Sequence, residues 1–107
     1  MVKELDDTNI KAFISEGHPA LILFYSEWCK YCQIFRPVFK EAAMDNDTPV
    51  RFGAYNCSNG STRAMKDFKV RYFPVIKFFK YGSFIKDYTG QRTVDGIKAF
   101  IVHNLDL

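Results

Sequence analysis

Cys29 and Cys32 stand three residues apart in the segment EWCKYC (27–32). Two thiols at this spacing can form a redox-active disulfide, supply part of a metal site, or pack as small buried side chains. A zinc site needs four ligands, whereas Cys57, His18 and His103 are scattered along the chain. We therefore expect neither a metal ion nor another cofactor, and the place of the pair in the fold must decide between redox chemistry and burial.

Strands and helices that alternate along the chain must position this pair. The run ALILFY (20–25) is apolar throughout, which is typical of a strand buried on both faces. The alternation predicts parallel strands, and a closing hairpin around Tyr81–Gly82 adds an antiparallel edge. The expected fold class is α/β, with a mixed sheet, helices on both faces, and one domain over residues 1–107. Apolar runs predict strands at 2–5, 20–25, 50–56, 74–79 and 83–88, and helical periodicity predicts helices at about 8–17, 29–44, 61–68 and 93–104.

This order places Cys29 where a central strand ends and a helix begins. Unpaired backbone N–H groups and the positive end of the helix dipole favour a thiolate there. Cys32 follows one turn later on the same helical face, within reach of a disulfide. Cys29 can thus attack a substrate disulfide, and Cys32 can resolve the mixed disulfide that results. The position favours redox chemistry over two structural thiols.

Composition and charge exclude several classes of function. The net charge of +3 is spread over 107 residues without a basic run, so we expect no contact with nucleic acid or with a membrane. The longest apolar run is far shorter than the roughly 20 residues of a membrane span. MVKELDD, at the start, lacks the apolar core of a signal peptide. The chain is either a native cytosolic protein or one domain of a longer precursor, and we expect a monomer.

Further motifs accompany the pair: LILFYSEWCKYC (21–32), RPVF (36–39), VRYFPVIKFF (70–79) and YGSFIKDYTGQR (81–92). This pattern spans nearly the whole chain and resembles the thioredoxin superfamily, most of all a catalytic domain of the protein disulfide isomerases. The resemblance implies the thioredoxin fold and thiol–disulfide exchange or isomerisation. It further implies cysteine-containing client proteins, an oxidase or reductase as redox partner, and a location in the endoplasmic reticulum lumen.

The resemblance also assigns roles to individual residues. It makes Cys29 the attacking cysteine, Cys32 the resolving one, and Cys29–Cys32 the redox disulfide. Arg92 matches an arginine that approaches the resolving cysteine and lowers its pKa. Pro74 matches a cis-proline that faces the pair, and the preceding peptide group at Phe73 would bind an extended substrate backbone. The implied substrate surface comprises Trp28, Lys30, Tyr31, Phe73 and Pro74.

Two departures from the family concern proton transfer. Leu23 stands six residues before the first cysteine, where these proteins usually carry a buried Glu or Asp that accepts the proton of the resolving thiol. We expect this loss to slow resolution. Lys77 is expected at the position that pairs with that carboxylate, so it must reach solvent, find another acceptor, or stay neutral.

Three alternatives of function follow from these residues. The first is an isomerase-like oxidoreductase, the second a thioredoxin-fold binding or chaperone module weakened by Leu23, and the third a cytosolic thioredoxin-type reductant. Cys57 is interpreted as a structural thiol. The triplets NCS (56–58) and NGS (59–61) fit the N-glycosylation pattern at Asn56 and Asn59, as in a secretory-pathway protein.

Overall fold

Strands and helices alternate in the predicted order in the computed structural model, which describes residues 1–59 and 62–105. All nine elements expected from the sequence are found within these residues, with ends that agree or differ by at most two residues. The elements are β1 (Val2–Leu5), α1 (Ile10–Ser15), β2 (Ala20–Tyr25), α2 (Lys30–Met44), β3 (Arg51–Asn56), α3 (Thr62–Asp67), β4 (Val75–Lys80), β5 (Ser83–Tyr88) and α4 (Val94–Leu105).

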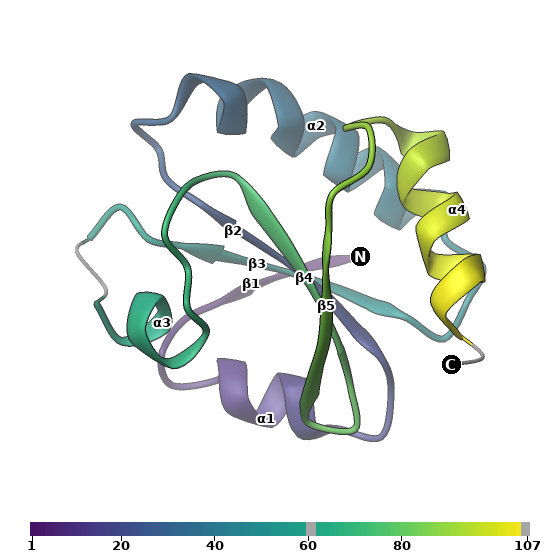
Figure 1. Ribbon diagram of the computed structural model, residues 1–107, viewed down its shortest axis with the longest axis horizontal. Coiled ribbons are helices and arrows are strands. Elements are labelled where there is room, and N and C mark those ends of the chain that lie inside the picture. The colour runs from purple at the N-terminus through teal and green to yellow at the C-terminus, as the bar shows by residue number, and fades with distance from the viewer. Residues whose placement is uncertain (60–61, 106–107) are drawn as a thin grey trace.

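The five strands form one mixed sheet in the order β1–β3–β2–β4–β5 (Figure 1). β3 runs parallel to both β1 and β2, whereas β4 is antiparallel to β2 and β5 is antiparallel to β4. The β2–β3 register runs from Ala20 opposite Arg51 to Tyr25 opposite Asn56. The two strands therefore end at the same edge of the sheet, and the loops that follow them meet there.

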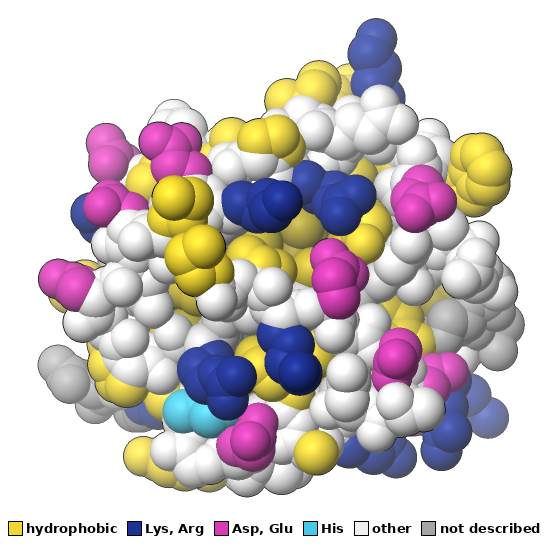
Figure 2. Space-filling view, turned by 180° about the vertical axis from the view of Figure 1, so that it is seen from behind, with side chains coloured by type: hydrophobic (Ala, Val, Ile, Leu, Met, Phe, Trp, Pro, Cys, Tyr) yellow, Lys and Arg dark blue, Asp and Glu magenta, His cyan; other side chains and the backbone are white. Residues whose placement is uncertain are grey.

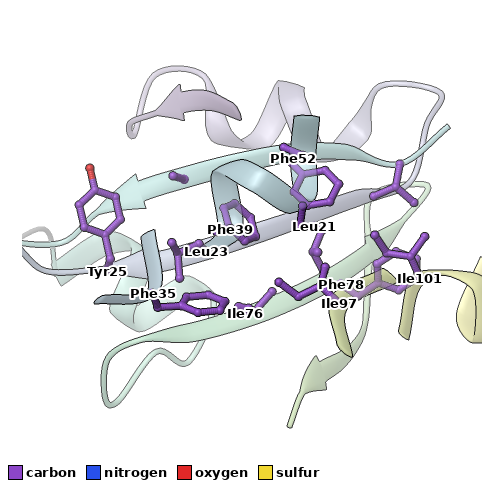
Figure 3. Close-up of a cluster of buried hydrophobic side chains, with 14 of the residues drawn as sticks. Leu21, Leu23, Tyr25, Phe35, Phe39, Phe52, Ile76, Phe78, Ile97 and Ile101 are labelled. Carbon is purple, nitrogen blue, oxygen red and sulfur yellow. The ribbon is translucent and has the colours of Figure 1, made fainter. Parts of the chain in front are cut away.

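Helices cover both faces of the sheet, as predicted. Side chains of β2 alternate between two buried clusters, one with residues of α2 and α4 and the other with residues of α1 and α3. Figure 3 shows the first cluster, in which Leu21, Leu23 and Tyr25 face Phe35 and Phe39 of α2. All six residues of β2 are buried, which confirms the interpretation of ALILFY as a strand enclosed on both faces.

The first two helices differ from prediction at their ends. α1 begins at Ile10, two residues later than expected, because the preceding turn is held by its own side chains: Asp6 accepts the N–H of Thr8, and Asn9 accepts the N–H of Asp6, each at 2.8 Å. α2 begins at Lys30, and Cys29 is its N-cap. The predicted start of the third helix at Ser61 lies outside the described residues.

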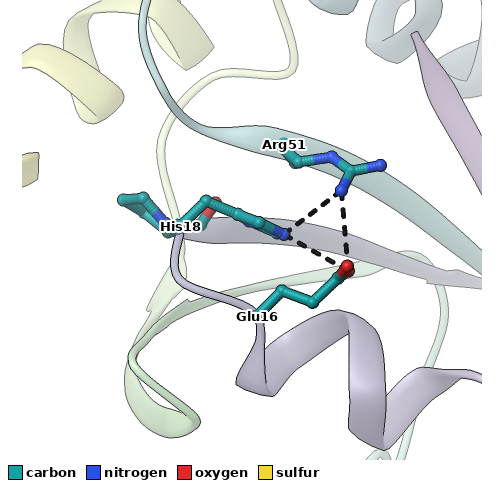
Figure 4. A network of polar contacts seen from close by, with 4 residues as sticks. Glu16, His18 and Arg51 are labelled. Atoms are coloured by element: carbon teal, nitrogen blue, oxygen red, sulfur yellow. Dashed lines mark hydrogen bonds and ion pairs between the residues drawn. The ribbon is translucent and has the colours of Figure 1, made fainter.

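A polar network lies at the end of the sheet away from the cysteine pair (Figure 4). Glu16 Oε1 is 3.5 Å from both His18 Nε2 and Arg51 Nη1, and Arg51 Nη1 is 3.4 Å from His18 Nε2. His18 precedes β2 and Arg51 opens β3, so these contacts join the beginnings of the two parallel strands. The other ends of the same strands carry the site described below.

Charged side chains of both signs are interspersed on the face of the molecule that Figure 2 shows. None of the helices within the described residues has the length and hydrophobicity needed to cross a bilayer.

Candidate active site

Cys29 lies at the N-terminus of α2, at the edge of the sheet where β2 and β3 end. Its backbone N–H donates to the carbonyl of Ser26 at 3.3 Å, and its Sγ accepts the backbone N–H of Cys32 at 3.2 Å. Cys29 is partly exposed, Cys32 is buried, and both thiols are free in this structure. One thiol can therefore meet a substrate while the other stays enclosed beside it.

Burial, together with a hydrogen bond to the Cys29 side chain, raises the pKa of the Cys32 thiol to about 12. A backbone hydrogen bond at Ser26 and the positive charge of Arg92 act in the opposite direction, lowering this pKa. Because burial dominates, Cys32 holds its proton at neutral pH and must lose it before it can attack a mixed disulfide.

The loop before β4 faces the cysteine pair. The Phe73–Pro74 peptide bond is cis, as predicted from the resemblance, and the Cys29 thiol donates to the carbonyl oxygen of Phe73 at 3.6 Å. Pro74 itself is buried. The backbone of Phe73 and the attacking sulfur thus lie within reach of the same bound segment.

The loop before the pair is held by residues that the sequence did not assign to this site. Ser58 Oγ accepts the backbone N–H of Glu27 at 2.6 Å, and the Asn56 side chain donates to Glu27 Oε1 at 3.1 Å. The Gln33 side chain donates to the carbonyl of Glu27 at 3.0 Å. One feature of the sequence could have indicated this contact: the predicted parallel pairing of β2 and β3, which brings Asn56 and Ser58 to the end of β2. Trp28, next in this loop, is 83% exposed.

A groove of about 210 Å³ lies between the loop before β4 and the end of β5. Among the described residues, Arg92 is the only charged one that lines it, and the Arg92 guanidinium carbon is 6.0 Å from the centre of the Tyr31 ring. The structure thus brings Pro74 and Arg92 together in one groove with Tyr31 at its edge, whereas Trp28 and Lys30 lie exposed outside its lining. The lining residues are Phe35, Tyr72, Pro74, Val75, Ile76, Tyr88, Thr89, Gly90 and Arg92.

The expected link between Lys77 and the Leu23 position is wrong. Leu23 packs in the cluster that contains Cys32, on the α2/α4 face. Lys77 lies opposite Ile22 in the β2–β4 register and points to the other face, because neighbouring residues of a strand alternate sides. Its Nζ donates to Asp87 Oδ1 at 2.8 Å and lies 4.9 Å from the centre of the Phe84 ring. Lys77 could have reached solvent, found another acceptor or stayed neutral, and the structure shows the second of these, with Asp87 as the acceptor.

Cys57 is buried, with 6% of its surface exposed, in the cluster on the α1/α3 face. Burial raises the pKa of its thiol to about 11, with a smaller contribution from the negative charge of Asp7. Both features fit an unreactive thiol. Asn56 of the NCS triplet is described, whereas Gly60 and Ser61 of the NGS triplet lie outside the described residues.

The described residues hold no group of three or more His, Cys, Asp or Glu side chains placed to bind a metal ion.

Comparison with known proteins gives consistent matches. Residues 1–103 match the family model for thioredoxin. Human endoplasmic reticulum resident protein 44 is 30% identical over 94% of this chain and 26% of its own length, and a Caenorhabditis elegans protein disulfide-isomerase A6 homolog is 34% identical over 92% and 23%. The solved human ERp44 zinc-bound form superimposes with a TM-score of 0.87 at 26% identity, covering 96% of this chain and 31% of that one. The chain spans about a quarter of the length of these two curated relatives.

Proposed function

Since the chain belongs to the thioredoxin family and carries its two cysteines at the start of α2, we propose that it is a thiol–disulfide oxidoreductase acting on protein cysteines. The observation that carries the proposal is the asymmetry of the pair: Cys29 is partly exposed at a helix N-terminus, and Cys32 is buried with a raised pKa. This asymmetry suits one cysteine to attack and the other to resolve.

The reaction begins when the Cys29 thiolate attacks one sulfur of a client disulfide. A Cys29–client disulfide forms and the second client sulfur leaves as a thiolate. Cys32 then loses its proton and attacks Cys29 Sγ, which releases the first client sulfur as a second thiolate. The client has gained two electrons and the protein holds a Cys29–Cys32 disulfide. The reverse sequence oxidises a client dithiol, and a separate redox partner must restore the starting state of the pair.

The proposed isomerase activity uses the same intermediate, the Cys29–client disulfide. If a client thiolate attacks the Cys29–client disulfide before Cys32 does, the client disulfide is rearranged and the Cys29 thiolate is regenerated. The raised pKa of Cys32 and the apolar Leu23 beside it slow the competing attack by Cys32, which lengthens the time available for rearrangement.

The substrate surface is proposed from the groove and its surroundings. The carbonyl of Phe73 beside Cys29 can bind the backbone of an extended client segment, as in strand addition. Trp28, Tyr31 and Tyr72 are large aromatic side chains, each more than 60% exposed, and provide apolar contact around the sulfur. Arg92 is proposed to favour loss of the Cys32 proton.

The wider setting is proposed from the relatives, several of which are named as proteins of the endoplasmic reticulum or as disulfide isomerases. We infer that residues 1–107 act as one thioredoxin domain in the lumen of that organelle, on cysteine-containing clients.

The experiment measures turnover in insulin reduction and in the reactivation of a scrambled disulfide protein, with Cys29→Ser as the control. Wild-type turnover well above that of Cys29→Ser in both assays supports the isomerase assignment. Activity in the reduction assay alone restricts the function to oxidoreduction. Turnover equal to that of Cys29→Ser in both assays contradicts the proposed activity.

A second candidate is a binding module that holds clients with little turnover. Leu23, in the position of the expected carboxylate, favours it, because an apolar side chain cannot accept the proton of Cys32, whose pKa is raised. Long-lived Cys29–client disulfides in the wild-type protein, isolated after acid quenching, would distinguish this module from an efficient oxidoreductase.

A further inference from the structure

Three positively charged residues in or next to the site in sequence have no acidic partner among the described residues. Within residues 1–59 and 62–105, Arg92 makes no ion pair or hydrogen bond with a carboxylate, and its one close contact is the face of the Tyr31 ring. Lys30, beside Cys29, and Arg71, two residues before Phe73, are exposed and likewise have no acidic partner among the described residues.

Acidic residues near this region in sequence do not pair with Arg92 among the described residues. Asp87 of β5 is paired with Lys77 on the other face of the sheet, and Glu27 accepts a hydrogen bond from the side chain of Asn56. Asp95 lies in the first turn of α4, three residues after Arg92, and forms no ion pair with it. In the part of the chain that the structure describes, the groove beside the pair has one charged group, the Arg92 guanidinium, and its other lining residues are uncharged. A guanidinium that lines such a groove is suited to bind a carboxylate through two parallel hydrogen bonds.

From this arrangement we propose that Arg92 selects client segments carrying an acidic side chain two residues from the reacting cysteine. The proposal rests on the proposed function and adds a substrate preference to it. In an extended segment, residues two apart point to the same side, about 7 Å apart along the strand. The carbonyl before Pro74 accepts a hydrogen bond from the Cys29 thiol, and Pro74 lines the same groove as Arg92. A segment joined to Cys29 that follows Phe73 and Pro74 would therefore present the side chain two positions away to that groove.

The expected preference is moderate because Arg92 is exposed. An ion pair in such a place changes the rate or affinity by about fivefold at low ionic strength. Because the Debye length falls to about 3 Å at 1 M salt, the preference should largely disappear there.

The test uses Cys32→Ser protein, in which the Cys29–peptide disulfide accumulates and any effect of Arg92 on Cys32 is removed. The substrates are matched peptides whose cysteine is activated as a disulfide with thionitrobenzoate, with Glu, Gln or Lys two residues before or two residues after the cysteine. Cys29 attacks the peptide sulfur, and thionitrobenzoate leaves as a coloured thiolate whose release gives the rate. At one of the two positions, Glu should react about fivefold faster than Gln, and Lys should react slowest.

Two variants at position 92 test whether the preference for Glu depends on the Arg92 side chain. Arg92→Gln should remove the preference for Glu over Gln, and Arg92→Lys should keep part of it. Arg63→Gln is the matched control, because Arg63 is an exposed arginine of α3 and does not line the groove. It should leave the preference unchanged.

The possible failures are distinguishable. Equal rates for Glu and Gln peptides at both positions, with reaction still dependent on Cys29, would overturn the preference and leave the oxidoreductase intact. If no peptide reacts, the proposed function fails instead, and the preference is read from NMR titrations with peptides whose cysteine is replaced by serine. Tighter binding of the Glu peptide that is lost in Arg92→Gln supports the acidic preference, and equal binding of Glu and Gln peptides contradicts it.

Discussion

Leu23 and Lys77 lie on opposite faces of the sheet, although their strands are paired. Ile76 is the residue opposite Leu23, and Lys77 is opposite Ile22, so the lysine points toward the face covered by α1 and α3. There its side chain is only 8% exposed, and its ammonium group is paired with Asp87 of the neighbouring strand. The lysine therefore stabilises the β4–β5 hairpin, and the sheet separates it from Cys32 and from the proton transfer of that thiol.

Removing Asp87 should destabilise the protein more than removing Lys77. Asp87→Asn leaves a buried ammonium group with no carboxylate, and we expect the free energy of unfolding to fall by roughly 2 kcal/mol, below the full value for a buried pair because Asp87 is 35% exposed. Lys77→Met removes the charge that needs the partner and should cost less. Urea unfolding of both variants, with exposed Lys86→Met as the control, measures the difference. The reverse order would mean that the pair contributes little.

Leu23→Glu should speed resolution of a mixed disulfide by Cys32, because it places a proton acceptor in the same buried cluster. The gain should be largest near neutral pH and should shrink as the pH approaches the pKa of Cys32, about 12. Stopped-flow resolution of a Cys29-linked peptide across a pH series measures it. Leu23→Gln is the control, because an amide has a similar shape and accepts no proton at these pH values. Equal rates for Glu and Gln at every pH would show that another group takes the proton.

The same substitution should cost stability independently of Lys77. Leu23 is 1% exposed, so a carboxylate there must be desolvated, at a cost of roughly 2–4 kcal/mol. Because Lys77 lies across the sheet, the double variant Leu23→Glu, Lys77→Met should show the sum of the two single effects within about 0.5 kcal/mol. Chemical denaturation of the four proteins checks this additivity. A coupling well above that value would mean that the new carboxylate reaches the lysine.

Cys29 should be the first of the three thiols to react with an alkylating reagent in the reduced protein. It is partly exposed, whereas Cys32 and Cys57 are buried and burial raises the pKa of both. Mass-spectrometric mapping after brief exposure to iodoacetamide gives the order. Early labelling of Cys57 would remove the basis for treating it as structural.

The reduced protein should lose stability in alkali, and Cys57 should account for part of the loss. Folding raises the pKa of Cys57 from 9.0 to about 11 and that of Cys32 from 9.0 to about 12. Above pH 9 the unfolded chain releases these protons while the folded protein keeps them, so stability falls as the pH rises toward 11. Urea unfolding between pH 8 and pH 11 should show a smaller fall for Cys57→Ala than for the wild type. Parallel pH profiles would contradict the assignment.

Local pattern was enough to identify the elements and the reactive pair. A strand enclosed on both faces is recognisable from ALILFY alone, because burial on both sides demands apolar residues at every position. Two cysteines three apart just after that strand share one helical turn wherever the helix packs. Pro74 and Arg92 could be selected only through the family resemblance, since a proline and a loop arginine carry little information of their own.

Contacts between distant segments were decided by the tertiary structure. The alternation of side chains along β4 is a local property, but the identity of each face depends on the register with β2 and on which helices cover it. Lys77 was therefore expected beside the Leu23 position, although it lies on the other face. Asn56 and Ser58 hold the loop before Cys29 because two parallel strands end at one edge, about thirty residues apart in the chain. Arg92 lines the groove beside Pro74 only because the hairpin returns the chain to the edge where the pair lies. Short-range periodicity determines which side chains are buried, whereas the sheet order and register decide which of them meet.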